Sequence, residues 1–484
     1  MPSKPLHARV AAALSATCLA LSALTATAAL PLRATPPVST DRFDQIYYAQ
    51  PHNTYLHSNK LTNWLDAGYR TVEIDVIDNG EWELNAKGPY VAHSWNPGNS
   101  NCSAATDDRL GDCLDDLTGW LDDNPIDVPL LVFIDMKANS NPAAAWNPDE
   151  IAKLDNFVRG YLGSRMYSYR DLAAHLAPNA NRAGLKTKGW PTISALKGKI
   201  IVAFTGGFYG NVNARMNDAR ALLAAESPAG PASFLCPDVD AGDPDEISGT
   251  IDGISATDST LYFCTNMQAG SHDQYTLNRS AEYRQILHQW GAAGAFTSTD
   301  YAWSYISVAH GASAIGWDVT ESLTATTVFR PAWLSSIPLV GKRRSLPGYF
   351  ELRTTFGKCV DVDGSDWDNG TKLIQYTCNS TDAQRFVYTA EGQLRPKGDT
   401  EYCADVRGGD GEEGAKLNIW KCDGGESEKW KISPEGLFAN RHNDWNWCMD
   451  VSGGSSADGV QLQLWGCSAS NSNEQFDPRL VPDF

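Results

Sequence analysis

The sequence predicts an α/β fold, a TIM-like (β/α) barrel, followed by a smaller all-β domain that repeats itself three times. The chain has 484 residues, more than a single domain usually holds. Strand-like and helix-like runs alternate over residues 41–330, which is typical of parallel βα units. After residue 348 one motif recurs three times, which indicates units that share a common core.

Residues 1–28 have the features of a secretory signal peptide. Lys4 and Arg9 give a positively charged start, an apolar stretch continues to about Leu24, and small residues at 26–28 suit the cleaving peptidase. A transmembrane anchor is the weaker interpretation because the apolar run is short, and no other segment reaches ~18 uninterrupted apolar residues. We therefore expect a secreted, extracellular protein without a transmembrane segment.

Charge and cysteine content narrow the class further. Without residues 1–28 the chain keeps 37 of its 39 basic residues against 58 acidic ones, a formal charge of −21. Such a chain repels nucleic acid at long range, so we expect no nucleic-acid partner. Of the 11 Cys, Cys18 leaves with the signal peptide, and an even ten in an exported protein indicate five disulfides. Neighbour pairing predicts Cys102 with Cys113, Cys236 with Cys264, Cys359 with Cys378, Cys403 with Cys422, and Cys448 with Cys467.

The α/β part follows a Pro- and Thr-rich stretch, residues 29–40, that is expected to be an N-terminal tail. Several strand candidates are nearly continuous apolar runs, as expected for parallel strands covered on both faces. An open doubly wound sheet is the alternative to a barrel. Residues 331–347 carry Pro and basic residues without periodicity and are expected to form a linker. The strand candidates are Thr71–Ile77, Pro129–Met136, Lys199–Thr205, Thr260–Thr265, Gly294–Thr299 and Ser313–Val319, and the helix candidates are Asn59–Ala67, Asp149–Leu162 and Arg279–Trp290.

Residues 348–480 consist of three similar units whose starts lie 44 and 45 residues apart. Each unit opens on Cys-x-Asp-Val, has a second Cys 19 positions later with an aromatic residue two places before it, and ends in Gln/Glu-x-aromatic. This pattern resembles the ricin-B-type lectin, a β-trefoil with QxW repeats. The resemblance implies that the closing triplets build the core, whereas the Asp, the aromatic residue and a nearby amide bind carbohydrate.

The third unit keeps the implied carbohydrate-binding pattern best, because apolar residues replace both expected amides in the first unit. A degenerate trefoil that acts as a folded spacer is the alternative. The candidate carbohydrate-binding residues are Asp450, Gln463, Trp465 and Asn473 in the third unit, Asp405 and Trp420 in the second, and Asp361 and Tyr376 in the first.

Acidic residues gather on the strand candidates of the α/β part. Glu73 and Asp75 are two apart on one strand, so both point to the same side. Two carboxylates on one face of a buried strand are costly unless a cation or a base lies between them. Asn53 and Asp135 add oxygen atoms at the ends of other strand candidates. An all-oxygen set suits a hard cation, Ca²⁺ with Mg²⁺ as the alternative.

Basic side chains accompany this acidic set. His52 and His93 lie at the ends of strand-like runs and suit proton transfer at a phosphorus centre. Lys137 offers a fixed positive charge for phosphate oxygens. In a barrel all of these side chains would face the rim formed by the carboxyl ends of the strands.

The order of these residues, His-Asn, Glu-x-Asp, His and Asp-x-Lys, resembles the catalytic X region of calcium-dependent phosphoinositide-specific phospholipases C. The resemblance covers residues 45–140, or 41–330 with the later strands. It implies a phosphoric diester hydrolase that acts on phosphatidylinositol-type phospholipids with peripheral membrane contact, while the trefoil binds a glycan. The family usually has Glu where Asp135 stands. The implied catalytic residues are His52, His93, Glu73 and Lys137, and the implied metal ligands are Asn53, Glu73, Asp75 and Asp135.

Three other functions remain open at this point. Asp135-Met136-Lys137 is similar to glycerophosphodiesterases and sphingomyelinase-D-like enzymes, so another phosphodiester could be the substrate of the same barrel. A glycoside hydrolase needs a carboxylate pair across a sugar ring and no histidine pair, which makes it the weaker interpretation. The third is a catalytically inactive protein that only binds sugar.

Overall fold

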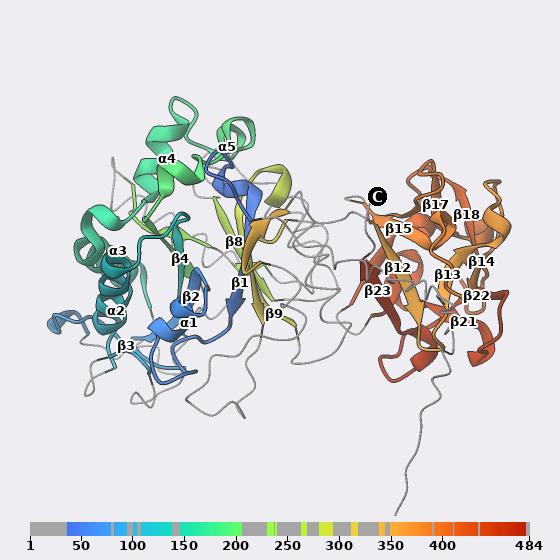
Figure 1. The fold of residues 1–484 in the computed structure, drawn as a ribbon, viewed down its shortest axis with the longest axis horizontal. Helices are drawn as coiled ribbons and strands as arrows, with labels where there is room; N and C mark the ends of the chain where they lie inside the picture. Colours follow the sequence, from blue (N-terminus) through green and yellow to red (C-terminus); the bar gives the residue numbers. More distant parts are fainter. Residues whose placement is uncertain are drawn as a thin grey trace, which may run out of the picture. The chain divides into compact units, whose positions relative to one another are not determined.

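The computed structural model describes residues 36–480 with internal gaps, all within the unit Leu32–Phe484. The expected signal peptide and the strand candidate Gly294–Thr299 lie outside the described residues. Figure 1 shows the α/β part in blue to yellow and the all-β part in orange to red. The gaps are residues 79–81, 94–99, 104–107, 138–145, 206–229, 237, 240–262, 269–279, 294–310, 318–337, 344–348, 390–391, 410 and 434–435.

Parallel strands form the frame of the α/β part and build a TIM-like barrel. The strands form two sheets, with the strand orders β11-β1-β10-β9-β8-β7 and β3-β2-β4-β5-β6. Among the described strands of these two sheets, only β3 and β11 pair antiparallel with a neighbour. The strands are β1 (Ile46–Pro51), β2 (Thr71–Ile77), β3 (Tyr90–Val91), β4 (Leu130–Met136), β5 (Ile200–Thr205), β6 (Phe234–Leu235), β7 (Asp238–Val239), β8 (Cys264–Gln268), β9 (Ile286–Ala293), β10 (Ala314–Trp317) and β11 (Val340–Lys342).

Alternate residues of these strands belong to two different cores. Leu131 and Phe133 of β4 pack in one cluster, called inner here, with Tyr48 of β1 and residues 169–185. Val132 and Ile134 pack in the outer cluster with residues 110–121 and 151–162. The next inward position on β4 is therefore Asp135, and the same alternation turns Glu73 and Asp75 inward on β2. The helices that supply or flank the outer layer are α1 (Thr62–Asp66), α2 (Leu110–Asp123), α3 (Pro148–Leu162), α4 (Tyr169–Leu176) and α5 (Arg182–Lys188).

Local sequence fixes the start of α3, which covers the outer layer. Asn147 is the N-cap and accepts hydrogen bonds from the backbone N–H groups of Asp149 and Glu150, while Pro148 occupies the first turn. The Glu150 side chain returns a bond to the Asn147 backbone and completes a capping box.

The two sheets meet at two seams, and each is closed without a strand ladder in the described part of the chain. At one seam the disulfide between Cys236 and Cys264 joins the end of β6 to the start of β8. At the other, β1 and β2 are linked by side chains of the site, and β11 pairs with β1 from Ile46 to Tyr48. The segment 331–347 was expected to be a linker, but its residues 340–342 form strand β11, which pairs with β1.

One helix prediction is wrong. Residues 279–290 were expected to be helical, but Ile286–Ala293 form β9, a strand that pairs in parallel with both β8 and β10. Its residues are buried towards both cores, Ile286 in the inner cluster and Leu287 in another. Pairing with two distant strands therefore overrides the helix-like pattern of this short apolar run.

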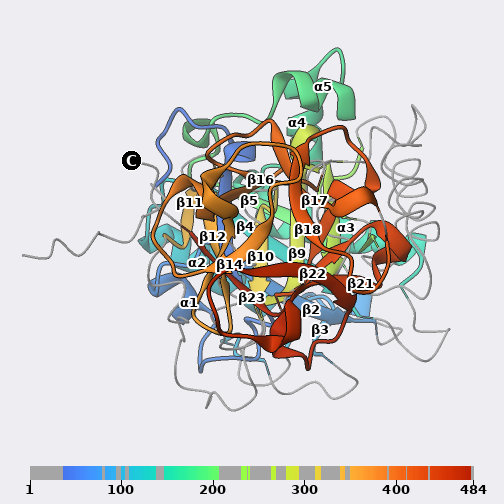
Figure 2. The same ribbon diagram turned by 90° about the vertical axis from the view of Figure 1, so that its right-hand side faces the viewer.

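The all-β part contains four strands from each of the three repeated units. Strands at unit boundaries pair with each other, β15 with β16, β19 with β20 and β23 with β12, so the chain closes on itself (Figures 1 and 2). This is the threefold β-trefoil arrangement. The strands are β12 (Tyr349–Thr354), β13 (Cys359–Val362), β14 (Leu373–Tyr376), β15 (Arg385–Tyr388), β16 (Leu394–Pro396), β17 (Tyr402–Val406), β18 (Leu417–Lys421), β19 (Trp430–Ile432), β20 (Phe438–Asn440), β21 (Trp447–Val451), β22 (Val460–Gly466) and β23 (Phe476–Leu480).

Equivalent positions of the three units fill one core. The hairpins place Val362 opposite Leu373, Val406 opposite Leu417, and Val451 opposite Leu462, all fully buried. A single unit could not bury these side chains alone, so the fold needs all three. The five disulfides have the partners that neighbour pairing predicts, and three of them recur at the same place in each trefoil unit.

Candidate functional site

Three carboxylates converge at the rim of the barrel. Oxygen atoms of Glu73, Asp75 and Asp135 all lie within 4.8 Å of one another. Asp75 and Asp135 face each other across the parallel pair β2 and β4, and Glu73 lies one inward position earlier on β2. Because the carboxyl ends of parallel strands share one edge, residues 60 positions apart in sequence form one cluster.

Among the described residues, the cluster carries more negative charge than its lysine partner balances. Lys137 Nζ lies 3.0 Å from Asp75 Oδ2 and 2.6 Å from Asp135 Oδ2. Burial raises the pKa of Asp75 to about 8, and the neighbouring Asp135 and Glu73 add to the rise while Lys137 opposes it. With all three acids ionised the group would carry two uncompensated negative charges, which is the charge that a divalent cation neutralises.

Unpaired oxygen atoms support the same conclusion. No residue that the structure describes donates a hydrogen bond to Asn53 Oδ1 or Asp75 Oδ1, although both atoms are buried. Buried acceptors without partners are costly, and carboxylate and amide oxygens are the ligands that a hard cation prefers. The donor chemistry of these oxygens therefore fits a hard cation such as Ca²⁺, which Asn53, Glu73, Asp75 and Asp135 would hold.

Glu73 is held in place by the chain that follows β1. The backbone N–H of Asn53 and Nε2 of Gln50 donate to Glu73 Oε2 at 3.1 and 3.3 Å. The Thr54 hydroxyl donates to the Glu73 carbonyl at 2.7 Å and accepts from its backbone N–H at 2.8 Å. Asn53 has φ 54°, a left-handed conformation that Asn tolerates better than most residues. These contacts both orient a carboxylate and close the seam between β1 and β2.

Tyr55 supports the second carboxylate. Its hydroxyl donates to Asp75 Oδ2 at 2.9 Å, and its side chain is fully buried. Burial raises the pKa of Tyr55, with the charge of Asp75 adding to the rise, so the hydroxyl stays protonated and remains a donor. Tyr55 thus fixes the Oδ2 atom of Asp75 and leaves the Oδ1 atom available to another ligand.

The two predicted histidines lie at different depths. His52 is largely buried, with Nε2 at 3.6 Å from Glu73 Oε1, and its ring stacks on Trp290 with centroids 5.9 Å apart. His93 is exposed and follows Ala92, whose backbone N–H donates to the Asp75 carbonyl at 3.1 Å. The backbone of His93 is therefore tied to the strand that carries the carboxylates.

Sequence reasoning missed four residues around this cluster: Gln50, Tyr55, Trp290 and His288. Gln50 and Tyr55 could have been found from the sequence, because Gln50 lies two residues before His52 and Tyr55 lies two residues after Asn53. Trp290 and His288 lie more than 230 residues later on β9, in a segment expected to be helical, and no local signal marks them.

On the trefoil, three exposed aromatic rings occupy equivalent positions. Tyr376, Trp420 and Trp465 are each 42% exposed, and each lies opposite the first Cys of its unit. A large ring left this open presents a flat apolar face on which a sugar ring can stack. The Asp of each unit lies two residues along the neighbouring strand, on the same face as the ring.

The third unit presents an ordered polar network beside its ring. Asp450 Oδ1 accepts from Gln463 Nε2 at 2.9 Å, and Gln463 Oε1 accepts from Lys416 Nζ at 2.7 Å. The fourth predicted residue, Asn473, is close to Gly454, where a Cβ would lie 3.0 Å from the Asn473 amide atoms. All four predicted residues of this unit therefore belong to one hairpin face and its adjoining turns.

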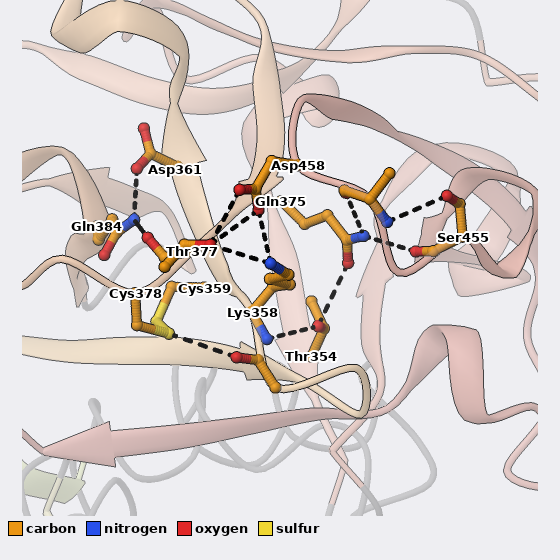
Figure 3. Close-up of polar contacts among 12 residues, drawn as sticks. Thr354, Lys358, Cys359, Asp361, Gln375, Thr377, Cys378, Gln384, Ser455 and Asp458 are labelled. Atoms are coloured by element: carbon orange, nitrogen blue, oxygen red, sulfur yellow. Dashed lines mark hydrogen bonds and ion pairs between the residues drawn. A yellow bond between two sulfur atoms is a disulfide. The ribbon is translucent and has the colours of Figure 1, made fainter.

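The first and second units use different partners for their Asp. In the first, Gln384 Nε2 donates to Asp361 Oδ2 at 2.5 Å (Figure 3). Ile374 lies opposite Asp361, the position that Gln463 has opposite Asp450 in the third unit. In the second, burial raises the pKa of Asp405 to about 6, and a hydrogen bond from Ser427 opposes the rise.

Family models match both parts of the chain. Residues 99–254 match the model described as phosphoinositide phospholipase C, Ca2+-dependent, and residues 348–476 match the ricin-type beta-trefoil lectin domain. The first match contains Asp135 and Lys137 and begins after His52 and Glu73. The chain thus has one part similar to Ca2+-dependent phosphoinositide phospholipase C and a second part similar to the ricin-type beta-trefoil lectin domain.

Several solved structures are similar to parts of the chain. A calcium-dependent phosphoinositol-specific phospholipase C from Pseudomonas sp. is 22% identical, with 59% of this chain and 93% of that chain covered and a TM-score of 0.46. The enzyme from Streptomyces antibioticus is 20% identical, with 57% and 95% covered and a TM-score of 0.45. The C-half of an earthworm R-type lectin is 18% identical over 28% of this chain and 100% of that chain, with a TM-score of 0.25. No curated protein sequence matches the chain.

The hydrogen bond from Tyr55 to Asp75 can be tested by Tyr55→Phe. We expect the affinity for Ca²⁺ to fall about tenfold, because a partner that orients a ligand carboxylate is lost. Isothermal titration calorimetry measures this. Tyr48→Phe is the matched control, since the buried Tyr48 hydroxyl donates to the Pro129 carbonyl instead. Equal Ca²⁺ affinities in both variants would contradict the role of Tyr55.

Proposed function

We propose that the chain is a secreted, Ca²⁺-dependent phosphodiesterase that acts on phosphatidylinositol-type phospholipids and binds carbohydrate through its trefoil. One observation carries the proposal: Glu73, Asp75 and Asp135 form a buried acidic cluster with His52 beside it. A divalent cation held there would polarise a phosphoryl oxygen and lower the pKa of a neighbouring hydroxyl.

The residues of the chain supply orientation and proton transfer. His52 lies against Glu73, so it can take the proton of an attacking hydroxyl while the carboxylate stabilises the imidazolium that forms. His93 is the candidate for protonating the leaving glycerol oxygen. Lys137, already placed against Asp75 and Asp135, contributes fixed positive charge to the same pocket of oxygens.

The family model supports an inositol-type substrate. In this class of reaction the 2-hydroxyl of the head group attacks phosphorus, the leaving glycerol oxygen is protonated, and water opens the cyclic phosphate. A substrate without a neighbouring hydroxyl cannot follow this route. Glycerophosphodiesters and sphingomyelin are the alternative substrates of the same barrel, and Mg²⁺ is the alternative cation.

An extracellular location fits both halves. Five disulfides persist in oxidising compartments. Within the part of the chain that the structure describes, no helix is both long and apolar enough to cross a bilayer. Because the chain without residues 1–28 has a formal charge of −21, charge alone does not attract it to anionic surfaces, and the trefoil would hold the enzyme at surfaces that bear glycans.

Product analysis tests the enzymatic half. With phosphatidylinositol vesicles and Ca²⁺ we expect ³¹P NMR to detect a cyclic inositol phosphate. A chelator should abolish turnover and added Ca²⁺ should restore it. His52→Ala and His93→Ala should each lower kcat by about 10²–10⁴-fold, the usual contribution of acid–base groups.

The outcomes separate the candidate substrates. Release of choline from sphingomyelin, or of free glycerophosphate, without any cyclic product would replace the inositol-lipid proposal by the alternative. Turnover that continues in excess chelator would contradict the role of the acidic cluster. Circular dichroism of each variant provides the folding control.

Single aromatic substitutions test the trefoil half. Because the three rings are exposed, Trp465→Ala, Trp420→Ala and Tyr376→Ala should change stability by no more than about 0.5 kcal/mol. We expect Trp465→Ala to weaken binding of a glycan identified on an array by about five- to tenfold, the worth of one lost stacking contact. Equal loss in all three variants would show that the third unit is not the main site.

The second unit should bind in a pH-dependent way. Sugar hydroxyls donate to an ionised Asp405, so protonation below about pH 6 should weaken this unit. The folded-state pKa lies above the ordinary 3.8, so the same protonation favours the folded state as the pH falls from 6 to 3.8. Loss of binding is therefore not loss of folding. The glycan affinity of Trp465→Ala, in which the first and second units remain, is measured from pH 7.5 to 5. An affinity that does not change over this range would contradict the prediction.

A further inference from the structure

A buried histidine inside the barrel has no part in the mechanism above. His288 lies on β9, is 1% exposed, and pairs in register with Asn266 of β8. Its strand position is inward-facing, because Ile286, two residues earlier, packs in the inner cluster. A histidine this deep is either a packing residue or part of the site, and its contacts decide between the two.

The ring of His288 is fixed in position and in tautomer. It stacks on Phe133 with centroids 4.0 Å apart and an interplanar angle of 19°. Its Nδ1 lies 2.6 Å from Asn266 Oδ1, an oxygen that only accepts, so Nδ1 carries the proton. Nε2 therefore has a lone pair and is a hydrogen-bond acceptor.

The imidazole is also neutral. The pKa of His288 is lowered to about 3, mainly by burial and also by its electrostatic interaction with His52, while Asp135 opposes the shift. The same two residues place His288 within electrostatic reach of the candidate active site. A neutral ring with one committed nitrogen offers only the other nitrogen to a ligand.

The acceptor lies beneath the carboxylate cluster. Phe133, on which the ring stacks, is the register partner of Glu73 and precedes Asp135 by two residues on β4. Among the residues that the structure describes, none hydrogen-bonds to the buried Nε2 atom. A packing histidine would normally satisfy both nitrogens, so the free acceptor points to a missing donor.

Two neighbouring inward positions show the same feature. Gln50 Oε1 and Thr205 Oγ1 are buried without a hydrogen-bond partner in the described part of the chain. Gln50 is bound to Glu73 through its other amide atom, and Thr205 is the register partner of Asp135. Below the carboxylate cluster, the site is thus lined with buried polar atoms that could accept hydrogen bonds from the O–H groups of a ligand.

We propose that His288 Nε2 accepts a hydrogen bond from an O–H group of whatever fills the carboxylate site. Two species have that chemistry: a water held by the cation, and a hydroxyl of a polyol head group. The identity of this ligand rests on the proposed function. The inference assigns His288 as a ligand-binding residue inside the barrel.

Binding measurements on the full chain distinguish the two donors. His288→Phe keeps a ring against Phe133 and removes the acceptor, and Tyr48→Phe removes a buried hydroxyl elsewhere on the inner face as a control. The probes are Ca²⁺ alone and myo-inositol with saturating Ca²⁺. We expect His288→Phe to weaken one of them about five- to tenfold, the value of one lost hydrogen bond.

Each outcome has a separate meaning. Weaker Ca²⁺ binding identifies the cation-held water as donor, and weaker myo-inositol binding at unchanged Ca²⁺ affinity identifies the head-group hydroxyl. If wild type binds Ca²⁺ and His288→Phe binds both probes equally well, the inference is overturned while the proposed function stands. If wild type binds no Ca²⁺, the proposed function fails.

A measurement on the unmodified chain guards against misfolding of the variant. With ¹⁵N-labelled histidine, the unprotonated Nε2 of His288 should give an NMR resonance that shifts when a hydrogen bond forms. We expect this shift on addition of Ca²⁺ or of myo-inositol with Ca²⁺, with Nδ1 unchanged. A resonance that stays in place with both ligands bound would also overturn the inference.

Discussion

The buried cluster of Glu73, Asp75 and Asp135 has fewer positive than negative charges, and many contacts of the barrel rim are made around it. Three carboxylates meet at the rim, and Lys137 is the lysine or arginine that contacts them among the residues the structure describes. Folding this arrangement without a cation forces a proton onto Asp75, whose pKa burial raises to about 8. The surrounding contacts serve the same point: Tyr55 fixes one oxygen of Asp75, and the segment after β1 fixes Glu73. The residues that orient Glu73 also close the seam between β1 and β2, so the same contacts serve the barrel and the site.

Much of this could be predicted from sequence where the signal is local. The strand with Glu73 and Asp75 has the bounds Thr71–Ile77 that its nearly continuous apolar run predicts, and the trefoil follows from a motif that recurs three times. The prediction failed where distant pairing decides: Ile286–Ala293 form a strand only because β8 and β10 flank them. His288 and Trp290 were missed for that reason, since no pattern near them indicates that their strand lies under the carboxylates.

The trefoil shows how one fold can vary its sites without changing its core. The valine and leucine pairs of the three hairpins are equivalent and fully buried, and the three rings are equally exposed. The polar partners of the Asp residues differ, an amide of the closing triplet in the first unit and Gln463 in the third. Fold and site are therefore specified by different residues of the same repeat, which is why the repeat predicts the fold more firmly than the ligand.

Calorimetry of Ca²⁺ binding in buffers of different ionisation enthalpy tests the central claim most directly. A buried cluster that holds a proton on Asp75 must release it when the cation binds. We predict one saturable site, about one proton released per Ca²⁺ near pH 7, and almost none above about pH 9, because Asp75 is then already ionised. The conservative Asp75→Asn variant should bind weakly and release no proton. Absence of saturable binding, or binding unchanged by Asp75→Asn, would contradict the account.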